Sequence, residues 1–169
     1  MQNLLPTLLD HDIGMLEIIA RRWDVDLASL DKREAAEMLA SAMLDPERAR
    51  IEWGRLNDTE RGALQMLLSA PDHKMTEAQF SRLFGEIRRM GPGRRDREKP
   101  HLNPANAAEA LYFRGLLAIT YDQAKTGAQR FVYVPTDLAA VLPTHETGFQ
   151  VEAEPSPAYE RGEYEPQTV

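Results

Sequence analysis

Apolar residues recur every three or four positions along most of the first 84 residues, a spacing that buries one face of an α-helix. The clearest stripe contains Ile13, Leu16, Ile19 and Ala20 and predicts a helix that ends near Trp23. Similar stripes, one of which includes Met38, predict further helices over residues 31–44, 46–55, 57–70 and 76–85. The first half of the chain is therefore expected to be helical.

Start signals support these helix boundaries. Asp31–Glu34 and Asn57–Glu60 have the spacing of capping boxes, in which two side chains bond to each other's backbone N–H. Asp45–Pro46 places proline at a first helical position, where its missing N–H is not needed. Residues 1–11 are expected to be an irregular lead-in, because a proline interrupts their leucines, and Pro71–Met75 is expected to be a loop.

Alternation typical of a strand appears late in the chain, in Phe131–Val134. The stretch Ala108–Pro135 predicts a short amphipathic helix, a glycine-marked turn and two strands joined by a polar hairpin loop. The helix is expected to begin near Pro104, and a short closing helix is expected over residues 137–142. A helix that leads directly into a two-stranded hairpin is typical of the end of a winged helix.

These elements predict a mainly α fold with a small β-hairpin, of the α+β class. Residues 1–55 are expected to form an N-terminal three-helix unit with the helix–link–helix order of SAP-like units, and residues 56–143 a winged-helix domain. Residues 144–169 contain few aliphatic residues, several prolines and six glutamates. They are expected to be an acidic disordered tail or a linker.

The composition is that of an ordinary globular protein, with 43% hydrophobic and 28% charged residues. The chain contains no cysteine, which excludes disulfides and cysteine-based zinc sites and fits a reducing cytoplasm. No apolar run approaches the roughly 20 residues of a membrane span. The N-terminus also lacks the basic start of a signal peptide. We therefore expect a cytoplasmic protein without a membrane partner.

The formal net charge of −7 argues against a protein that coats nucleic acid indiscriminately, but the charge is uneven. Residues 82–101 have a local charge of +4, whereas the segment after Thr144 has a local charge of −5. The stretch 90–103 is poor in apolar residues and is expected to be a long exposed loop. The candidate phosphate-binding residues in and before this loop are Arg88, Arg89, Arg94, Arg95, Arg97 and Lys99.

Two interpretations of this basic loop remain open. Arginine suits phosphate because its planar fork offers paired donors, and the backbone of Gly91–Gly93 could approach an anion closely. Alternatively, the loop is a solvated segment with internal ion pairs, because Asp96 and Glu98 lie among the arginines.

The helix before the hairpin occupies the position of a recognition helix. Its exposed side chains suited to nucleic acid are Asn106 and Arg114, whereas Glu109 would face phosphate unfavourably. The hairpin adds Lys125 and Arg130, which suffice for a backbone contact and no more. This shortage of donors argues against sequence-specific base reading, and many winged helices serve as protein-docking units.

Catalytic and metal-binding patterns are not evident in the sequence. Asp10–Asp12 contains a histidine between two acids, but adjacent residues point in different directions and no histidine recurs one helical turn later. The chain also lacks the GxxxxGK[ST] phosphate loop and the acidic magnesium motif of an ATP-driven motor. We expect no enzymatic activity, no cofactor and no metal site.

An ordered series of segments resembles a known family. The segments are SLDKREAAEML, LNDTERGALQMLL, GPGRRDREKP, AEALYFRGLL and VYVPTDLAAVL. The series resembles bacterial proteins that carry the XPB-type helicase N-terminal domain, and the resemblance extends over Leu4–Leu142. It implies a helicase-associated module that bears a winged helix and contacts DNA. Because the motor motifs are missing, the chain is expected to be a stand-alone accessory protein or the front of a longer one.

Two functions from different classes follow. The first is a non-catalytic, DNA-associated winged-helix module that contacts the phosphate backbone through the arginine-rich loop, with a helicase motor as a candidate protein partner. The second is a protein–protein interaction adaptor with the same fold and no nucleic-acid binding, which the acidic balance and the glutamate-rich tail favour. Arginines that converge on one uncovered face would support the first, and arginines paired with acids would support the second.

Overall fold

The computed structural model describes residues 2–28, 30–124 and 127–143, with residues 122–124 and 127–128 described by their backbone alone. The described chain is mainly helical and contains a three-stranded antiparallel sheet, which confirms the predicted α+β class. The predicted tail, residues 144–169, and the candidate phosphate-binding residue Lys125 lie outside the described residues.

The first part of the chain forms helices that begin where the capping signals predict. Both capping boxes form, and Asp45 accepts a hydrogen bond from the Glu47 N–H with Pro46 at the first helical position. Asp12 caps its helix by accepting a hydrogen bond from the Met15 N–H at 2.7 Å. The helices are α1 (Leu4–Leu9), α2 (Ile13–Arg22), α3 (Lys32–Met43), α4 (Pro46–Gly54) and α5 (Asp58–Ser69).

Helix α1 corrects the prediction of an irregular lead-in over residues 1–11. Pro6 lies in its first turn, where a missing N–H breaks no helical hydrogen bond. Leu4 and Leu8 are buried, and the Leu4 N–H donates a hydrogen bond to Asp137 Oδ1 at 2.8 Å. This helix is therefore stabilised by residues far away in the sequence, such as Asp137, and a local sequence pattern cannot predict those contacts.

The second part of the chain combines short helices with the sheet. The hairpin and the closing helix confirm the prediction, and the hairpin pairs Ala118 with Tyr133. The elements are a 3₁₀ turn (Pro71–His73), β1 (Lys74–Thr76), α6 (Glu77–Phe84), α7 (Pro92–Glu98), α8 (Ala107–Tyr112), β2 (Ala118–Ala124), β3 (Gly127–Tyr133) and α9 (Thr136–Val141).

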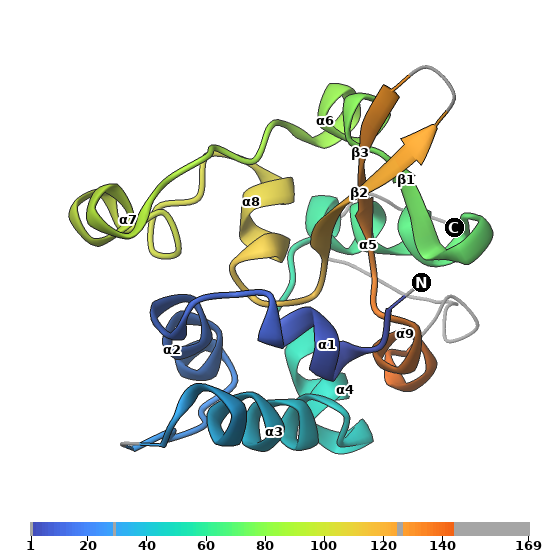
Figure 1. Cartoon of the computed structure of the whole chain (residues 1–169). Coiled ribbons are helices and arrows are strands. Elements are labelled where there is room, and N and C mark those ends of the chain that lie inside the picture. The colour runs from blue at the N-terminus through green and yellow to red at the C-terminus, as the bar shows by residue number, and fades with distance from the viewer. Residues whose placement is uncertain (1, 29, 125–126, 144–169) are drawn as a thin grey trace.

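Strand β1 was not expected, because Pro71–Met75 has the sequence of a loop. Lys74 pairs with Tyr133 and Thr76 with Phe131, both antiparallel, so the strand order is β1-β3-β2 (Figure 1). A strand of three residues is too short to show alternation, and its pairing with the central strand β3 stabilises it.

The inward faces of two helices differ from the predicted stripes. Ile13 and Met38, which the stripes place on buried faces, are 42% and 45% exposed. α2 instead buries Met15 and Ile18 beside the predicted core residues, and α3 buries Ala36. Each stripe predicted its helix correctly but misplaced one edge of the buried face.

Side chains from both predicted units form one hydrophobic cluster. The Trp23 indole N–H at the end of α2 donates a hydrogen bond to the Arg114 carbonyl at 2.7 Å. Gly115, in the turn between α8 and β2, has a φ of +76°, and a Cβ added there would lie 2.8 Å from Ile19 Cγ2. The α8–β2 turn is therefore packed directly against the N-terminal helices.

Candidate functional site

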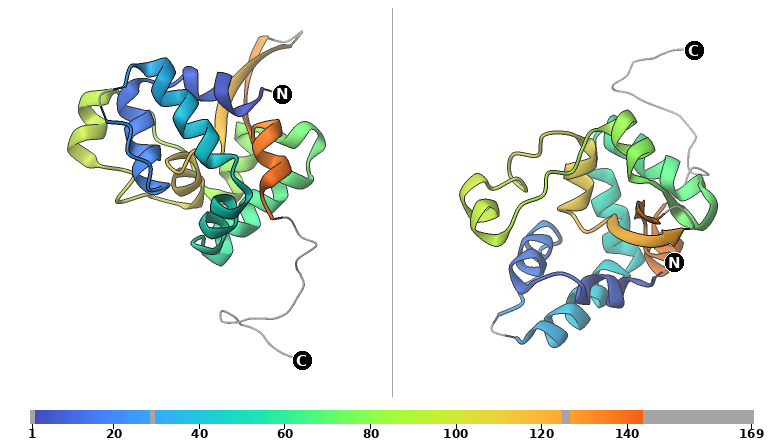
Figure 2. Two further views of the ribbon diagram at one scale, coloured as in Figure 1. Left: turned by 90° about the horizontal axis from the view of Figure 1, so that it is seen from below. Right: turned by 45° about the horizontal axis from the view of Figure 1, so that its top comes forward.

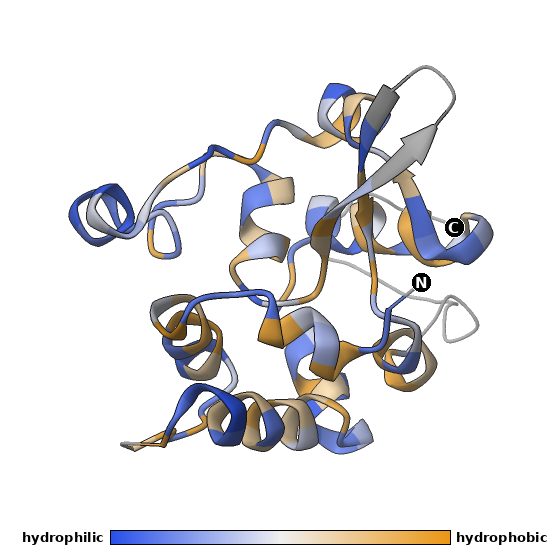
Figure 3. Cartoon of the chain, in the orientation of Figure 1, coloured by the Kyte–Doolittle hydropathy of each residue, from blue (hydrophilic) through white to orange (hydrophobic). Residues whose placement is uncertain are grey.

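The predicted basic loop contains helix α7, which lies at the edge of the molecule beside α2 (Figures 1 and 2) and is almost entirely hydrophilic (Figure 3). The prediction of a long exposed loop over residues 90–103 is therefore wrong across Pro92–Glu98. The helix ends at Lys99, whose φ of +49° is left-handed. It lacks an apolar stripe, so hydrophobic periodicity cannot reveal it, and its buried residue is Arg95.

Arg95 attaches α7 to the start of α2. Its side chain is 9% exposed and lies 3.0 Å from Asp12, counted from Nη2 to Oδ1. Burial alone would raise the pKa of Asp12, but hydrogen bonds from the Met15 N–H and from Arg95 bring that pKa below its ordinary value. Arg95 is thus engaged in a structural ion pair, in contrast to the exposed position predicted for it.

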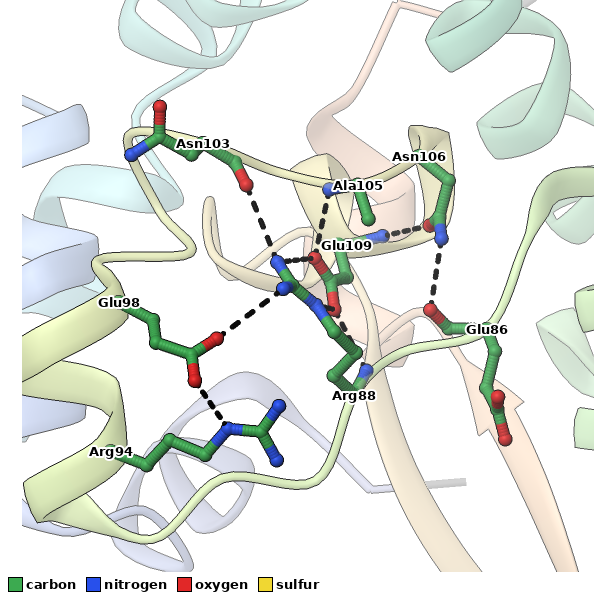
Figure 4. Close-up of polar contacts among 8 residues, drawn as sticks. All are labelled: Glu86, Arg88, Arg94, Glu98, Asn103, Ala105, Asn106 and Glu109. Atoms are coloured by element: carbon green, nitrogen blue, oxygen red, sulfur yellow. Dashed lines mark hydrogen bonds and ion pairs between the residues drawn. The ribbon is translucent and has the colours of Figure 1, made fainter.

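Glu109 organises the segment that leads into α7 (Figure 4). It is fully buried, so the prediction that it lies on an exposed face is wrong. One carboxylate oxygen accepts hydrogen bonds from the Arg88 N–H and Nε, both at 2.8 Å, and the other accepts one from the Ala105 N–H at 2.9 Å. Burial raises the pKa of Glu109, but these bonds outweigh it and leave the pKa below its ordinary value. Arg88 is therefore held by protein carboxylate.

Asn106 serves as the N-cap of α8. Its Oδ1 accepts a hydrogen bond from the Glu109 N–H, and its Nδ2 donates one to the Glu86 carbonyl at 2.9 Å (Figure 4). Gly85, with a φ of +102°, packs so closely that an added Cβ would collide with the Asn106 side chain. Both polar ends of Asn106 are used within the fold, so this predicted base-reading residue has a structural role.

Three further predicted site residues also form ion pairs. Arg94 lies 2.8 Å from Glu98 on the exposed side of α7, and Arg130 lies 3.0 Å from Glu77. Arg114 is 8% exposed and pairs with the buried Glu52, so the expectation that Arg114 is exposed is wrong. Arg130 and Glu77 are 53 positions apart in the sequence, and Arg114 and Glu52 are 62 positions apart. Local sequence patterns do not reveal pairs so far apart.

Exposed cations remain at the junction of α2 and α7. Arg21, Arg89, Arg97 and Lys99 are exposed and Arg22 is half-buried, and the charges of Arg21, Arg22 and Lys99 act on His101. Burial lowers the pKa of His101 most, and the positive charges of Arg21, Lys99, Arg22 and Arg95 lower it further. We name Arg21, Arg22 and Lys99 the basic face.

Sequence reasoning found Lys99 but missed Arg21 and Arg22. Both arginines lie in the last turn of α2, where positive charge is favourable to the helix dipole. Their presence in the sequence is explained by this local role, so nothing in the sequence indicates that they lie near α7, which is about 75 residues later in the chain.

The chain was compared with known proteins at the level of families, sequences and folds. Neither the protein-family models nor the curated proteins nor the solved structures contain a match to it. The resemblance to XPB-type helicase N-terminal domains therefore stays a prediction.

Two further properties concern the described part of the chain. It contains no helix that is long and apolar enough to cross a membrane. Residues 2–28, 30–124 and 127–143 also hold no group of three or more histidine, aspartate or glutamate side chains placed to bind a metal ion.

Two partly buried histidines predict a loss of stability in mild acid. The pKa of His11 and of His101 is lowered from 6.5, mainly by burial, so the unfolded chain binds more protons just below pH 6.5. The free energy of unfolding, measured in urea, is expected to fall between about pH 7.5 and 5.5. Lowered carboxyl pKa values, such as that of Asp12, act only at lower pH. In His101→Gln the decrease should be smaller; a stability that rises toward pH 5.5 would contradict this origin.

Proposed function

We propose that the chain is a non-catalytic, DNA-associated module in which residues 56–143 adopt the winged-helix fold. That fold consists of helix, strand, helix, helix and a strand hairpin in this order, with the first strand paired to the last. The order α5, β1, α6, α8, β2 and β3 supports the proposal, as does the strand order β1-β3-β2. In this fold α7 is an insertion between the second and third helices, α6 and α8. The SAP-like arrangement of residues 1–55 is supported by the short connection between α2 and α3, the helix–link–helix order expected of such a unit.

The observation that carries the DNA proposal is the basic face around His101. Like charges held together repel one another, and Arg21 and Lys99 form no ion pair with other described residues, whereas the charge of Arg22 is partly offset by Glu52 and Glu60. The phosphate backbone of DNA would neutralise these charges. Because Asn106 and Arg114, the predicted base-reading residues, are engaged within the fold, the contact is expected to depend little on sequence. The resemblance to helicase N-terminal domains points to the same association.

Charge reversal on the basic face tests this proposal. The double variant Arg21→Glu and Lys99→Glu is expected to lose at least about tenfold in affinity for a DNA duplex at about 50 mM salt, because phosphate contacts dominate such binding. Fluorescence anisotropy with a labelled duplex measures the loss.

The matched control is the double variant Arg33→Glu and Arg50→Glu on α3 and α4. Both arginines are exposed, and the change in net charge is the same. The control should retain the affinity of the unchanged protein to within about threefold. Equal losses in the two double variants would contradict a localised site, because they would reflect net charge alone.

The second candidate is a protein-interaction adaptor. It is favoured by the pairing of Arg88, Arg94, Arg95, Arg114 and Arg130 with carboxylates, which offsets the charge that these five predicted residues would otherwise offer to the phosphate backbone of DNA. Absence of any duplex affinity at low salt would support the adaptor and reject the DNA proposal.

A further inference from the structure

A cavity of about 220 Å³ lies between α2, the segment before α7, the end of α8 and the sheet. Apolar side chains, among them Met15, Phe113 and Ile119, form part of its wall. The remaining wall is strongly basic and contains Arg88, Arg89, Arg95 and Arg130. No carboxylate among the described residues lines it.

The arginines of this cavity are held in place from outside it. Glu109 holds Arg88, Asp12 holds Arg95 and Glu77 holds Arg130, and none of these acids lines the cavity. The pairing fixes three guanidinium groups, so a ligand would not have to order flexible side chains in order to bind.

Arg89 differs from the other three arginines of the cavity, which are held by ion pairs. Arg89 is exposed and forms no ion pair in the described part of the chain; its charge acts on Glu77, the partner of Arg130, without closing an ion pair, so its guanidinium remains available at the cavity.

We propose that this cavity binds a small organic anion with a single carboxylate attached to an apolar body. Guanidinium groups match a carboxylate in shape and charge, and Met15, Phe113 and Ile119 would pack against the apolar part. Inorganic phosphate fits less well, because its remaining oxygens would face apolar side chains without hydrogen bonds. The volume is below the roughly 300–1,000 Å³ of pockets for drug-sized ligands, which limits the body to about one ring or one branched chain.

This site is separate from the basic face. Arg21, Arg22 and Lys99 do not line the cavity, and Arg89 does not belong to the basic face. Binding of an organic acid can therefore be tested without reference to DNA, and either proposal can fail while the other stands.

The test is calorimetric titration of the full chain with benzoate and phenylacetate, and with benzamide and inorganic phosphate as comparison probes. We expect saturable binding of at least one acid with a Kd of about 1 mM or tighter, and at least about tenfold weaker binding of benzamide and of phosphate. No saturation by either acid up to about 10 mM would overturn the proposal. Benzamide binding as tightly as the acids would also overturn it, since the positive charge of the arginines would then have no role. Phosphate binding as tightly as the acids would overturn the proposal that the ligand has an apolar body.

Substitution of Arg89 locates the binding. Arg89→Gln removes the cation without a structural partner and is expected to weaken acid binding at least about fivefold. Arg94→Gln is the matched control, because Arg94 lies in the same segment, pairs with Glu98 and does not line the cavity. Equal weakening in both variants would contradict the assignment to this cavity. The duplex affinity of Arg89→Gln reports separately on DNA binding.

Discussion

Replacing Arg114 with alanine is expected to lower the free energy of unfolding by about 3–5 kcal/mol. Arg114 and Glu52 are 8% and 1% exposed, and their ion pair joins the end of α8 to α4. Without the guanidinium, the buried carboxylate keeps an ion pair with Arg55, a half-exposed residue 3.2 Å away. A buried charge that has lost its close partner is costly. Urea denaturation of the variant measures the loss.

Exposed pairs supply the control for this experiment. Arg50→Ala breaks the pair with Glu47 on the surface of α4 and should change stability by no more than about 0.5 kcal/mol. The double variant Arg114→Met and Glu52→Leu should recover part of the loss, because no charge then remains buried. A cost below about 1 kcal/mol for Arg114→Ala would contradict a structural role for this pair.

Replacing Glu109 with alanine is expected to cost a similar amount, about 3–5 kcal/mol, and to loosen a defined segment. The carboxylate accepts hydrogen bonds from the backbone N–H groups of Arg88 and Ala105 as well as from the Arg88 guanidinium. These donors would be left unsatisfied at a position that is fully buried. Besides lower stability, we expect faster amide hydrogen exchange in residues 86–106.

Glu98 provides a comparison at the same arginine. Its carboxylate lies 3.6 Å from Arg88 Nη1 but is 41% exposed, so Glu98→Gln is expected to cost far less stability than Glu109→Ala. If Glu98→Gln and Glu109→Ala destabilised the protein equally, burial of Glu109 would not be the reason for its importance.

Local chemistry explains which parts of the fold could be predicted. Capping boxes at Asp31 and Asn57, and the alternating strand Phe131–Val134, act over a few residues, and the structure contains each of them. The elements that were missed depend on partners far along the chain. α1 needs Asp137, β1 needs β3, and α7 is attached through Arg95 to Asp12, which is 83 residues away.

In the candidate site, too, local interactions could be predicted from the sequence and contacts between distant residues could not. The alternative of internal ion pairs was confirmed locally for Arg94 and Glu98, which are four residues apart on α7. The partners of Arg88, Arg114 and Arg130 come from other elements, so residues that resembled phosphate ligands became structural. Arg21 and Arg22 belong to the basic face only because the fold brings α2 near α7, which no local pattern in either segment indicates.

The salt dependence of duplex binding tests the central claim most directly. If the basic face, together with Arg97, neutralises three or four phosphates, the logarithm of the affinity should fall with the logarithm of salt concentration with a slope of about −3. Between about 50 and 200 mM salt this amounts to a loss of roughly 60-fold. An affinity that is absent at about 50 mM salt, or that does not change with salt, would contradict phosphate contact by this protein.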